Sequence, residues 1–218
     1  MAKKTKLKEE KETKIDKGIK KYFPFVIGLA VLAVIFIVLY FAFQDLGKVK
    51  YEGLTFIKEK YGDVQVYHYY YLTQLSSGKV RSIDIFLRGN PAENKVPVKG
   101  EIVYPAGKTV YISINGTGLK ECTYNIVAIA SLTGFLVNNE LNVKAGTPDK
   151  EEAKMNNSTH ITCATYPSST TLAIRTGSET KITRVEGFCY DVEISNCEIL
   201  PALEKFIVQS IIDAKKTS

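Results

Sequence analysis

The sequence has no closely spaced cysteine pair, although it contains four cysteines. Structural zinc sites and thioredoxin-like redox sites both depend on C-x-x-C or similarly short spacing. The nearest fragment, His160 three residues before Cys163, stands alone. We therefore predict no metal site and rank a thiol–disulfide enzyme third among the candidate functions. In an oxidising compartment, an even number of cysteines favours two disulfides, here from Cys122, Cys163, Cys189 and Cys197.

Tryptophan is absent altogether, which weakens the case for a platform that stacks sugars. The most unusual local composition is four tyrosines and one histidine at positions 67–71. Alternation along a strand puts Tyr67, Tyr69 and Tyr71 on one face, where they form a candidate surface for a sugar or peptide. Because tyrosine is a preferred strand residue, half-buried packing is the competing interpretation.

No catalytic group or cofactor motif assembles from the sequence. His160 has no nucleophile or carboxylate near it in the sequence. Residues 107–109 (GKT) resemble the end of a phosphate-binding loop, but Ile102 replaces the required glycine and a strand follows. Residues 116–118 (GTG) match two thirds of a dinucleotide fingerprint, but Glu121 replaces its third glycine and would repel a pyrophosphate. We therefore predict no catalytic residue and no cofactor, and interpret residues 116–118 as a glycine-rich turn.

Charged and amide side chains are missing from residues 22–43. A helix of this length spans roughly 33 Å, about the thickness of the hydrocarbon core of a bilayer. The run is longer than a signal-peptide core and has no small-x-small cleavage site at its end, so it predicts an uncleaved transmembrane signal-anchor helix. The alternative is a buried helix of a soluble core, but such helices are rarely apolar on every face.

Lysine is concentrated on one side of this run. Residues 1–21 carry nine lysines and four acidic residues, whereas residues 44–218 carry twenty basic and nineteen acidic residues. The excess of lysine belongs in the cytoplasm, so the C-terminal part is expected outside it. The expected organisation is a basic cytoplasmic tail (1–21), a transmembrane helix (22–43), a linker (44–51) and an extracytoplasmic domain (52–218). The bilayer is one expected partner, and the balanced outer domain argues against nucleic acid.

The first half of the outer domain reads as a β-meander. Segments 54–61 and 64–72 flank Gly62-Asp63, a hairpin signal, and segment 80–88 alternates apolar and polar residues. A polar loop over residues 89–100 follows. The segments EIVY (101–104) and KTVYISI (108–114) then predict a further pair of strands around Pro105-Ala106-Gly107.

The second half combines helices with strands, which gives an α+β fold with a mixed sheet and two main helices. Helical spacing predicts about five turns from Leu119. A short helix is expected after Thr147 as N-cap and Pro148 at N1. The last helix, roughly 201–215, is expected to bury one face, formed by Leu203, Phe206, Ile207, Ser210 and Ile211.

Four strands are also expected in this half, at residues 159–164, 170–175, 180–185 and 189–194. In an up-and-down meander the end of the first strand lies beside the start of the fourth, which brings Cys163 near Cys189. The favoured pairings are therefore Cys163–Cys189 and Cys122–Cys197.

Three glycosylation sequons fall on predicted turns, with acceptors Asn115, Asn156 and Asn157. They matter only in an organism that glycosylates exterior proteins.

Several stretches together resemble membrane-anchored proteins predicted from the genomes of small-genome archaea. These stretches are LRGNPAENKVPVKG, TGLKECTYNIVAIASL, AGTPDKEEA and CYDVEISNCEILPALEKF. The resemblance covers most of residues 50–215 and implies an archaeal envelope setting. It implies no activity, because those proteins are uncharacterised.

The leading functional interpretation is a non-enzymatic envelope protein whose outer domain binds another envelope protein or cell-surface material. A ligand-binding module that uses the tyrosine-rich strand and the 89–100 loop comes second, and a thiol–disulfide enzyme third.

Overall fold

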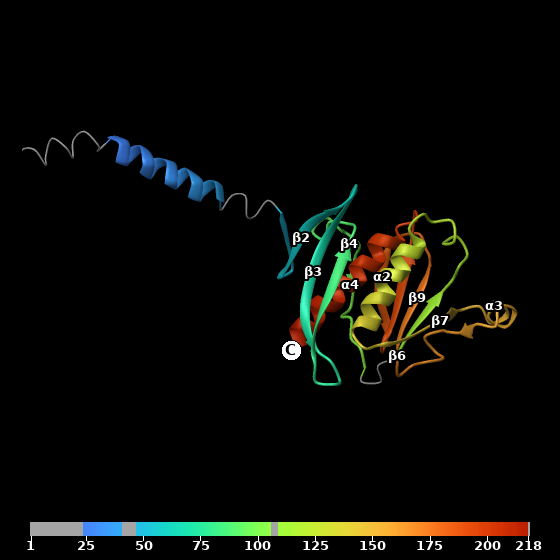
Figure 1. The fold of residues 1–218 in the computed structure, drawn as a ribbon. Helices are drawn as coiled ribbons and strands as arrows, with labels where there is room; N and C mark the ends of the chain where they lie inside the picture. Colours follow the sequence, from blue (N-terminus) through green and yellow to red (C-terminus); the bar gives the residue numbers. More distant parts are fainter. Residues whose placement is uncertain (1–23, 41–46, 106–108, 218) are drawn as a thin grey trace, which may run out of the picture. The chain divides into compact units, whose positions relative to one another are not determined.

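The computed structural model describes residues 24–40, 47–105 and 109–217 (Figure 1). The chain forms two compact units, and the boundary between them falls between Lys48 and Val49, within the expected linker. The predicted tail (1–21) lies outside the described residues, as do the two ends of the predicted membrane helix, residues 44–46 of the linker and most of the turn at 105–107.

Residues 24–40 form a helix with exposed side chains. Among the described residues, no helix is both long enough and apolar enough to cross a bilayer. The membrane helix predicted over residues 22–43 therefore stays a prediction.

The first sheet of the second unit, called the antiparallel sheet below, confirms three strands of the predicted β-meander, at 54–61, 64–72 and 80–88, whereas the predicted strand at 108–114 lies in the other sheet. Its strands pair in the order β1-β2-β3-β4, and β3 is antiparallel to both β2 and β4. Gly62 has a φ of +60° in the tight turn between β2 and β3, where glycine adopts the left-handed conformation without strain. The strands are β1 (Lys48–Tyr51), β2 (Leu54–Tyr61), β3 (Val64–Gln74) and β4 (Val80–Leu87).

The second sheet, the mixed sheet, has seven strands among the described residues, in the order β5-β10-β11-β9-β6-β7-β8. Strands β10 and β11 pair antiparallel, and all other neighbours pair parallel. The strands are β5 (Val98–Lys99), β6 (Thr109–Ile114), β7 (Asn142–Thr147), β8 (Thr159–His160), β9 (Thr170–Thr176), β10 (Lys181–Glu186) and β11 (Cys189–Ile194).

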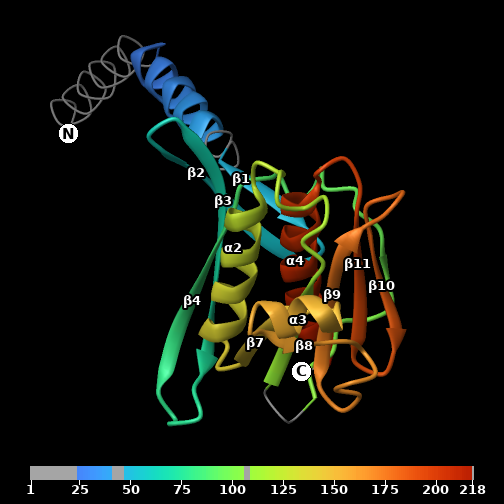
Figure 2. The ribbon, with the colours of Figure 1, turned by 90° about the vertical axis from the view of Figure 1, so that its right-hand side faces the viewer.

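Two long helices lie between the sheets, so this unit has three layers (Figures 1 and 2). Helix α2 (Asn125–Asn138) connects β6 to β7, and α4 (Ile199–Thr217) follows β11. The short helix α3 (Lys150–Met155) connects β7 to β8 and lies beside them at the edge of the mixed sheet. Buried side chains of both sheets and of α2 and α4 form a single hydrophobic cluster. The chain is therefore α+β, as predicted.

Helix α4 is buried on nearly every side, not on the single face that the sequence predicted. From Ala202 to Asp213 only Gln209 is not buried. The reason is that the antiparallel sheet covers the side of α4 that faces away from the mixed sheet (Figure 1).

The segment from Arg88 to Tyr104 supplies partners for the polar groups of α4. The Glu204 carboxylate accepts hydrogen bonds from the backbone N–H groups of Arg88 (2.5 Å) and Gly89 (3.0 Å). The Ile102 N–H donates to the Asp213 carboxylate at 3.0 Å. The predicted EIVY strand is wrong: residues 101–105 form no strand, because the N–H groups of Ile102 and Val103 donate to the side chains of Asp213 and Tyr190 instead.

Two predicted helix starts are also wrong. Helix α2 begins at Asn125 rather than Leu119, because residues 117–121 form turns in which the N–H groups of Leu119 and Lys120 both donate to Gly116 O. Helix α3 is capped by Asp149 rather than by Thr147; the Asp149 side chain accepts from the N–H groups of Glu151 and Glu152.

Both predicted disulfides are present, but the meander behind the prediction is wrong. Cys122–Cys197 and Cys163–Cys189 have Cα–Cα distances of 5.2 and 5.6 Å. Strand β8 lies at the far edge beside β7, and β11 lies between β9 and β10. Cys189 nevertheless meets Cys163, because β11 runs parallel to β9 with Cys189 opposite Thr171, so both strands start where the segment after β8 passes.

Candidate functional site

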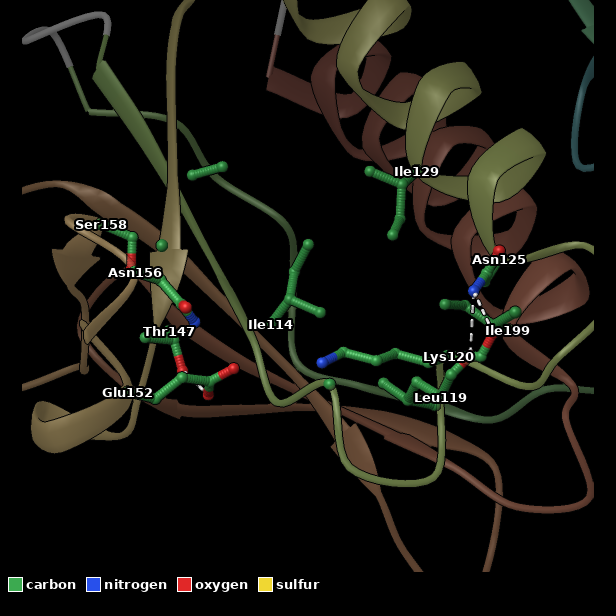
Figure 3. A pocket seen from close by; sticks show the side chains of 13 residues that line it. Ile114, Leu119, Lys120, Asn125, Ile129, Thr147, Glu152, Asn156, Ser158 and Ile199 are labelled. Atoms are coloured by element: carbon green, nitrogen blue, oxygen red, sulfur yellow. Dashed lines mark hydrogen bonds between the residues drawn. The ribbon is translucent and has the colours of Figure 1, made fainter. Parts of the chain in front are cut away.

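The carboxyl ends of the parallel strands β6 and β7 border a crevice of about 390 Å³ (Figure 3). In sheets of this kind, ligands bind outside the carboxyl ends of the strands, where the connecting loops leave the sheet. The other walls are the loop into α2, one side of α2 and the segment around α3. The lining residues are Ile114, Gly116, Leu119, Lys120, Asn125, Ile129, Ala145, Gly146, Thr147, Glu152, Asn156, Ser158 and Ile199.

Two glycines shape the loop between β6 and α2. Gly118 has a φ of +75°, in the left-handed region that favours glycine. At Gly116, an added Cβ would lie 2.8 Å from Lys120 Cε, so the absence of a side chain lets Lys120 cross the loop. The N–H groups of Leu119 and Lys120 are used within the loop, each 3.3 Å from Gly116 O. These two donors are therefore not available to cradle a pyrophosphate.

Lys120 extends into the crevice (Figure 3). Its side chain is exposed, and within the described ranges its ammonium group has no carboxylate or hydrogen-bond partner. Asn125 fixes the loop beneath it, because its Nδ2 donates to the carbonyls of Leu119 (3.0 Å) and Lys120 (3.1 Å). The loop therefore presents an unpaired positive charge from an anchored backbone.

The opposite wall is polar and comes from β7 and the α3 segment (Figure 3). Thr147 Oγ1 donates to Glu152 Oε2 at 2.7 Å, which orients that carboxylate. Asn156 and Ser158 are exposed, and neither side chain has a partner in the part of the chain that the structure describes. This wall thus offers an amide, a hydroxyl and a carboxylate across from Lys120.

The groups that line the crevice are suited to binding a ligand. A cation that faces an amide, a hydroxyl and a carboxylate suits an anion that also carries hydroxyl or amide groups, which can donate to that carboxylate. Apolar contact comes from Ile114, Leu119, Ile129 and Ile199. No histidine or cysteine is among the lining residues. His160 lies nearby in the sequence, but its Nε2 pairs with the carbonyl of Pro148 at 3.1 Å.

The predicted ligand surface of Tyr67, Tyr69 and Tyr71 is not an open surface. Tyr67 and Tyr69 are 7% and 8% exposed, and both belong to the hydrophobic core. Tyr71 is half-buried, and its hydroxyl donates to Asn139 Oδ1 at 2.7 Å. This face of β3 turns toward the helices, so the half-buried packing interpretation holds for the tyrosines.

The opposite face of the antiparallel sheet is exposed and rich in apolar side chains. Tyr61, Tyr70 and Phe86 are 57%, 56% and 46% exposed, and the Phe86 ring stacks on His68 at 4.4 Å between centroids. Further exposed apolar residues on this sheet are Ile57, Val64, Leu72 and Val80. Such contiguous patches mark interaction sites on folded domains.

His68 lies at the centre of this exposed face between two carboxylates. Its Nδ1 is 2.9 Å from Glu59 Oε1, and its Nε2 is 3.0 Å from Asp84 Oδ1. Burial lowers the pKa of His68, but the hydrogen bonds to Glu59 and Asp84 outweigh burial, so the net change is a raised pKa. The arrangement favours an imidazolium ion clamped across three strands.

The cysteines carry no free thiol in the described chain, because all four are paired. Cys122 and Cys189 are also buried. Neither bond joins residues with the short spacing of disulfide exchange enzymes, so the disulfides are best explained as cross-links of the fold.

The three sequon asparagines differ in exposure. Asn156 and Asn157 are exposed after the end of α3, whereas Asn115 is half-buried and its Oδ1 accepts from the N–H of Thr117 at 3.1 Å. Asn156 also lines the crevice. Use of the sequons stays a prediction.

Comparison with protein-family models, curated proteins and solved structures finds no significant match for this chain. The resemblance to archaeal membrane-anchored proteins also stays a prediction. Function must therefore be argued from the sites themselves.

Lys120 and its polar counterparts across the crevice were not predicted from the sequence. A usable signal was present, since a strand, a Gly-x-Gly turn and a lysine two residues later precede a helix. The opposite wall gave no signal of its own, because Asn156 and Ser158 reach the crevice only through the β7–α3–β8 crossover.

Proposed function

We propose that the chain is a membrane-anchored binding module outside the cytoplasm, and that its crevice binds a small organic anion with hydroxyl or amide groups. The apolar run at residues 22–43 and the lysine-rich tail support the anchor and its orientation. The two disulfides support an oxidising compartment. A sugar acid, a sugar phosphate or an acidic amino-acid derivative has the required chemistry.

One observation carries this proposal: the unpaired ammonium group of Lys120 in a crevice at the carboxyl edge of the parallel strands. A charge left without a partner costs little at an exposed site, so it does not by itself require a ligand. Lys120 lies opposite Asn156 and Ser158, whose side chains are also unpaired, so one crevice holds a cation, an amide and a hydroxyl that are all available to a ligand.

Isothermal titration of the full-length chain with glucuronate, glucose 6-phosphate, N-acetylglutamate and inorganic phosphate tests the proposal. We expect one class to bind and Lys120→Met to weaken it about tenfold or more, because a hydrogen bond to a charged group contributes about 1.5–3 kcal/mol. Lys58→Met, which removes an exposed lysine from β2, is the matched control. Equal binding by both lysine variants, or no binding by any probe, would contradict the proposal.

A second candidate function, binding of an envelope protein, is favoured by the exposed face of the antiparallel sheet. The face is broad and combines Tyr61, Tyr70 and Phe86 with the charged His68 centre. Aromatic residues are enriched at protein interfaces, and this face is exposed rather than concave, so the occupant is a protein surface rather than a small molecule.

Cross-linking in intact membranes tests this second candidate. A photoreactive residue at Tyr70 should capture one defined protein, and Phe86→Ser in the same chain should abolish that product. The same residue placed at Glu179, an exposed position in the loop between β9 and β10, is the control. Identical products from both positions would count against an interface on the antiparallel sheet.

A further inference from the structure

A second cavity, of about 450 Å³, lies between the antiparallel sheet and the two long helices. Its lining includes Thr73 from β3, Phe135 from α2, and Ile211 and Ala214 from α4. It shares no lining residue with the crevice. Its volume is within the range that holds a small-molecule ligand.

Four of the polar side chains that line this cavity pair with one another. Tyr71 OH donates to Asn139 Oδ1 at 2.7 Å, and Tyr104 OH lies 2.9 Å from Ser210 Oγ. Ser210 Oγ donates in turn to the carbonyl of Phe206 at 2.8 Å. Burial raises the pKa of Tyr71 and Tyr104, so both hydroxyls stay neutral. A ligand in this cavity therefore needs to form few hydrogen bonds with the walls.

Lys215 is the exception among the lining residues. Its side chain is exposed, and its ammonium group lies over the Tyr69 ring, 5.5 Å from the centroid. Among the described residues it has no carboxylate partner, whereas its neighbour Lys216 pairs with Asp213 at 3.0 Å. The cavity thus combines paired polar side chains with one positive charge that has no carboxylate partner among the described residues.

We propose that this cavity binds a single hydrocarbon chain with an anionic head group, such as a fatty acid, with the chain between α2 and β3 and the head group at Lys215. Because these polar side chains already pair with one another, a hydrocarbon chain can lie beside them without breaking their hydrogen bonds. The ammonium group of Lys215 attracts the anionic head group. The proposal is independent of the function assigned to the crevice.

The chain has no tryptophan, so a single introduced tryptophan reports on this cavity alone. Thr73→Trp in the full-length chain, held in an amphipathic polymer without lipid, is titrated with 12-bromododecanoate, whose bromine quenches tryptophan fluorescence. We expect saturable quenching. Ala214→Phe in the same background should abolish it, because Ala214 is an exposed lining residue and a larger side chain there occupies the space without disturbing the core.

The charge is tested by comparing the acid with 12-bromododecanol. Lys215→Met should weaken the acid about fivefold, as expected for a partly exposed ion pair, and leave the alcohol unchanged. Lys120→Met should change neither. Quenching that never saturates, that is equal for a tryptophan at Glu179, or that survives Ala214→Phe would overturn the proposal. Weakening by Lys120→Met instead would assign the ligand to the crevice.

Discussion

Helices α2 and α4 share the middle layer of the second unit, yet they are buried to different extents. Helix α2 buries Ala128, Leu132, Phe135 and Leu136 and leaves Ile126 78% exposed. Helix α4 buries nearly every side chain from Ala202 to Asp213, including Glu204, Lys205 and Asp213. Besides the cover of the antiparallel sheet, α4 is contacted by the segment between β4 and β6, which supplies hydrogen-bond partners from Arg88, Gly89, Asn94 and Ile102.

This comparison shows that a charged residue does not always mark the solvent face of a helix. A buried charge is tolerated when hydrogen bonds or ion pairs replace its lost hydration. Lys205 meets this condition by donating to Tyr51 OH at 2.6 Å and to Asn94 O at 3.3 Å. Substitutions in α4 should therefore affect stability more than equivalent substitutions in α2.

The largest effect is expected from Phe206→Ala in α4. Phe206 is fully buried and its ring contacts that of Tyr190 edge-on at 5.7 Å. Urea unfolding should show a loss of about 3–5 kcal/mol, because the change leaves a cavity between the sheets. Phe135→Ala in α2 is the matched change, and we expect a smaller loss because Phe135 already lines an open cavity. A larger loss at Phe135 would reverse the comparison.

Asp213→Ala should destabilise the chain by about 2–3 kcal/mol. It leaves the buried N–H of Ile102 without its acceptor, and an unsatisfied buried donor costs about 1–3 kcal/mol. Asp213→Asn keeps an acceptor oxygen and should recover part of the loss in the same unfolding measurement. If both variants were equally stable, the hydrogen bond from Ile102 would not be what stabilises the strand-free segment.

Glu204→Gln should change the pH dependence of stability. Burial raises the pKa of Glu204 to about 7, although hydrogen bonds from Arg88 and Gly89 oppose the rise. Because the folded state holds this proton more tightly than the unfolded state, its contribution is full below about pH 4.5 and is lost as pH rises through about 7. The wild-type chain should therefore lose about 3 kcal/mol more than the variant between these pH values.

The measurement is the free energy of unfolding at several pH values for both chains, with Glu121→Gln, an exposed change, as the control. Parallel pH profiles for wild type and Glu204→Gln would show that the carboxyl titrates normally in the fold.

The smallest effect is expected from Ile126→Ser in α2. Its side chain is mostly exposed, so the free energy of unfolding should change by less than about 0.5 kcal/mol. A loss above about 1 kcal/mol would show that Ile126 packs against other parts of the chain, contrary to its exposed position.

Local patterns predicted the local structure well. The Gly62-Asp63 turn gave the β2–β3 hairpin, and the alternation of Ile83, Ile85 and Leu87 gave the buried face of β4. The strand order could not be predicted. Strand β11 lies between β9 and β10, and the length of the turn between β10 and β11 does not reveal this position. The disulfide pairs were correct only because Cys189 begins its strand beside the start of β9.

The binding sites could be predicted only in part. The glycine-rich turn at residues 116–118 was predicted, but the crevice that it borders was not, and Asn156 and Ser158 arrive from a different crossover. The tyrosines at 67, 69 and 71 were a candidate ligand surface, but they lie largely in the core. The alternation of residues along β3 showed that they share one face, but not that helices cover this face. Periodicity reports which residues share a face, but a face becomes interior or exterior only through the rest of the fold.

The bond between Cys122 and Cys197 has a mechanical consequence. It closes a covalent loop across a sequence separation of 75 residues that contains α2 and strands β7 to β11. A force that pulls the two ends of the chain apart would stretch the segments outside this loop and leave those inside it slack. The bond thereby withholds about 250 Å of contour length from extension. Under tension, the mixed sheet would keep most of its strands after the antiparallel sheet and α4 had been drawn out.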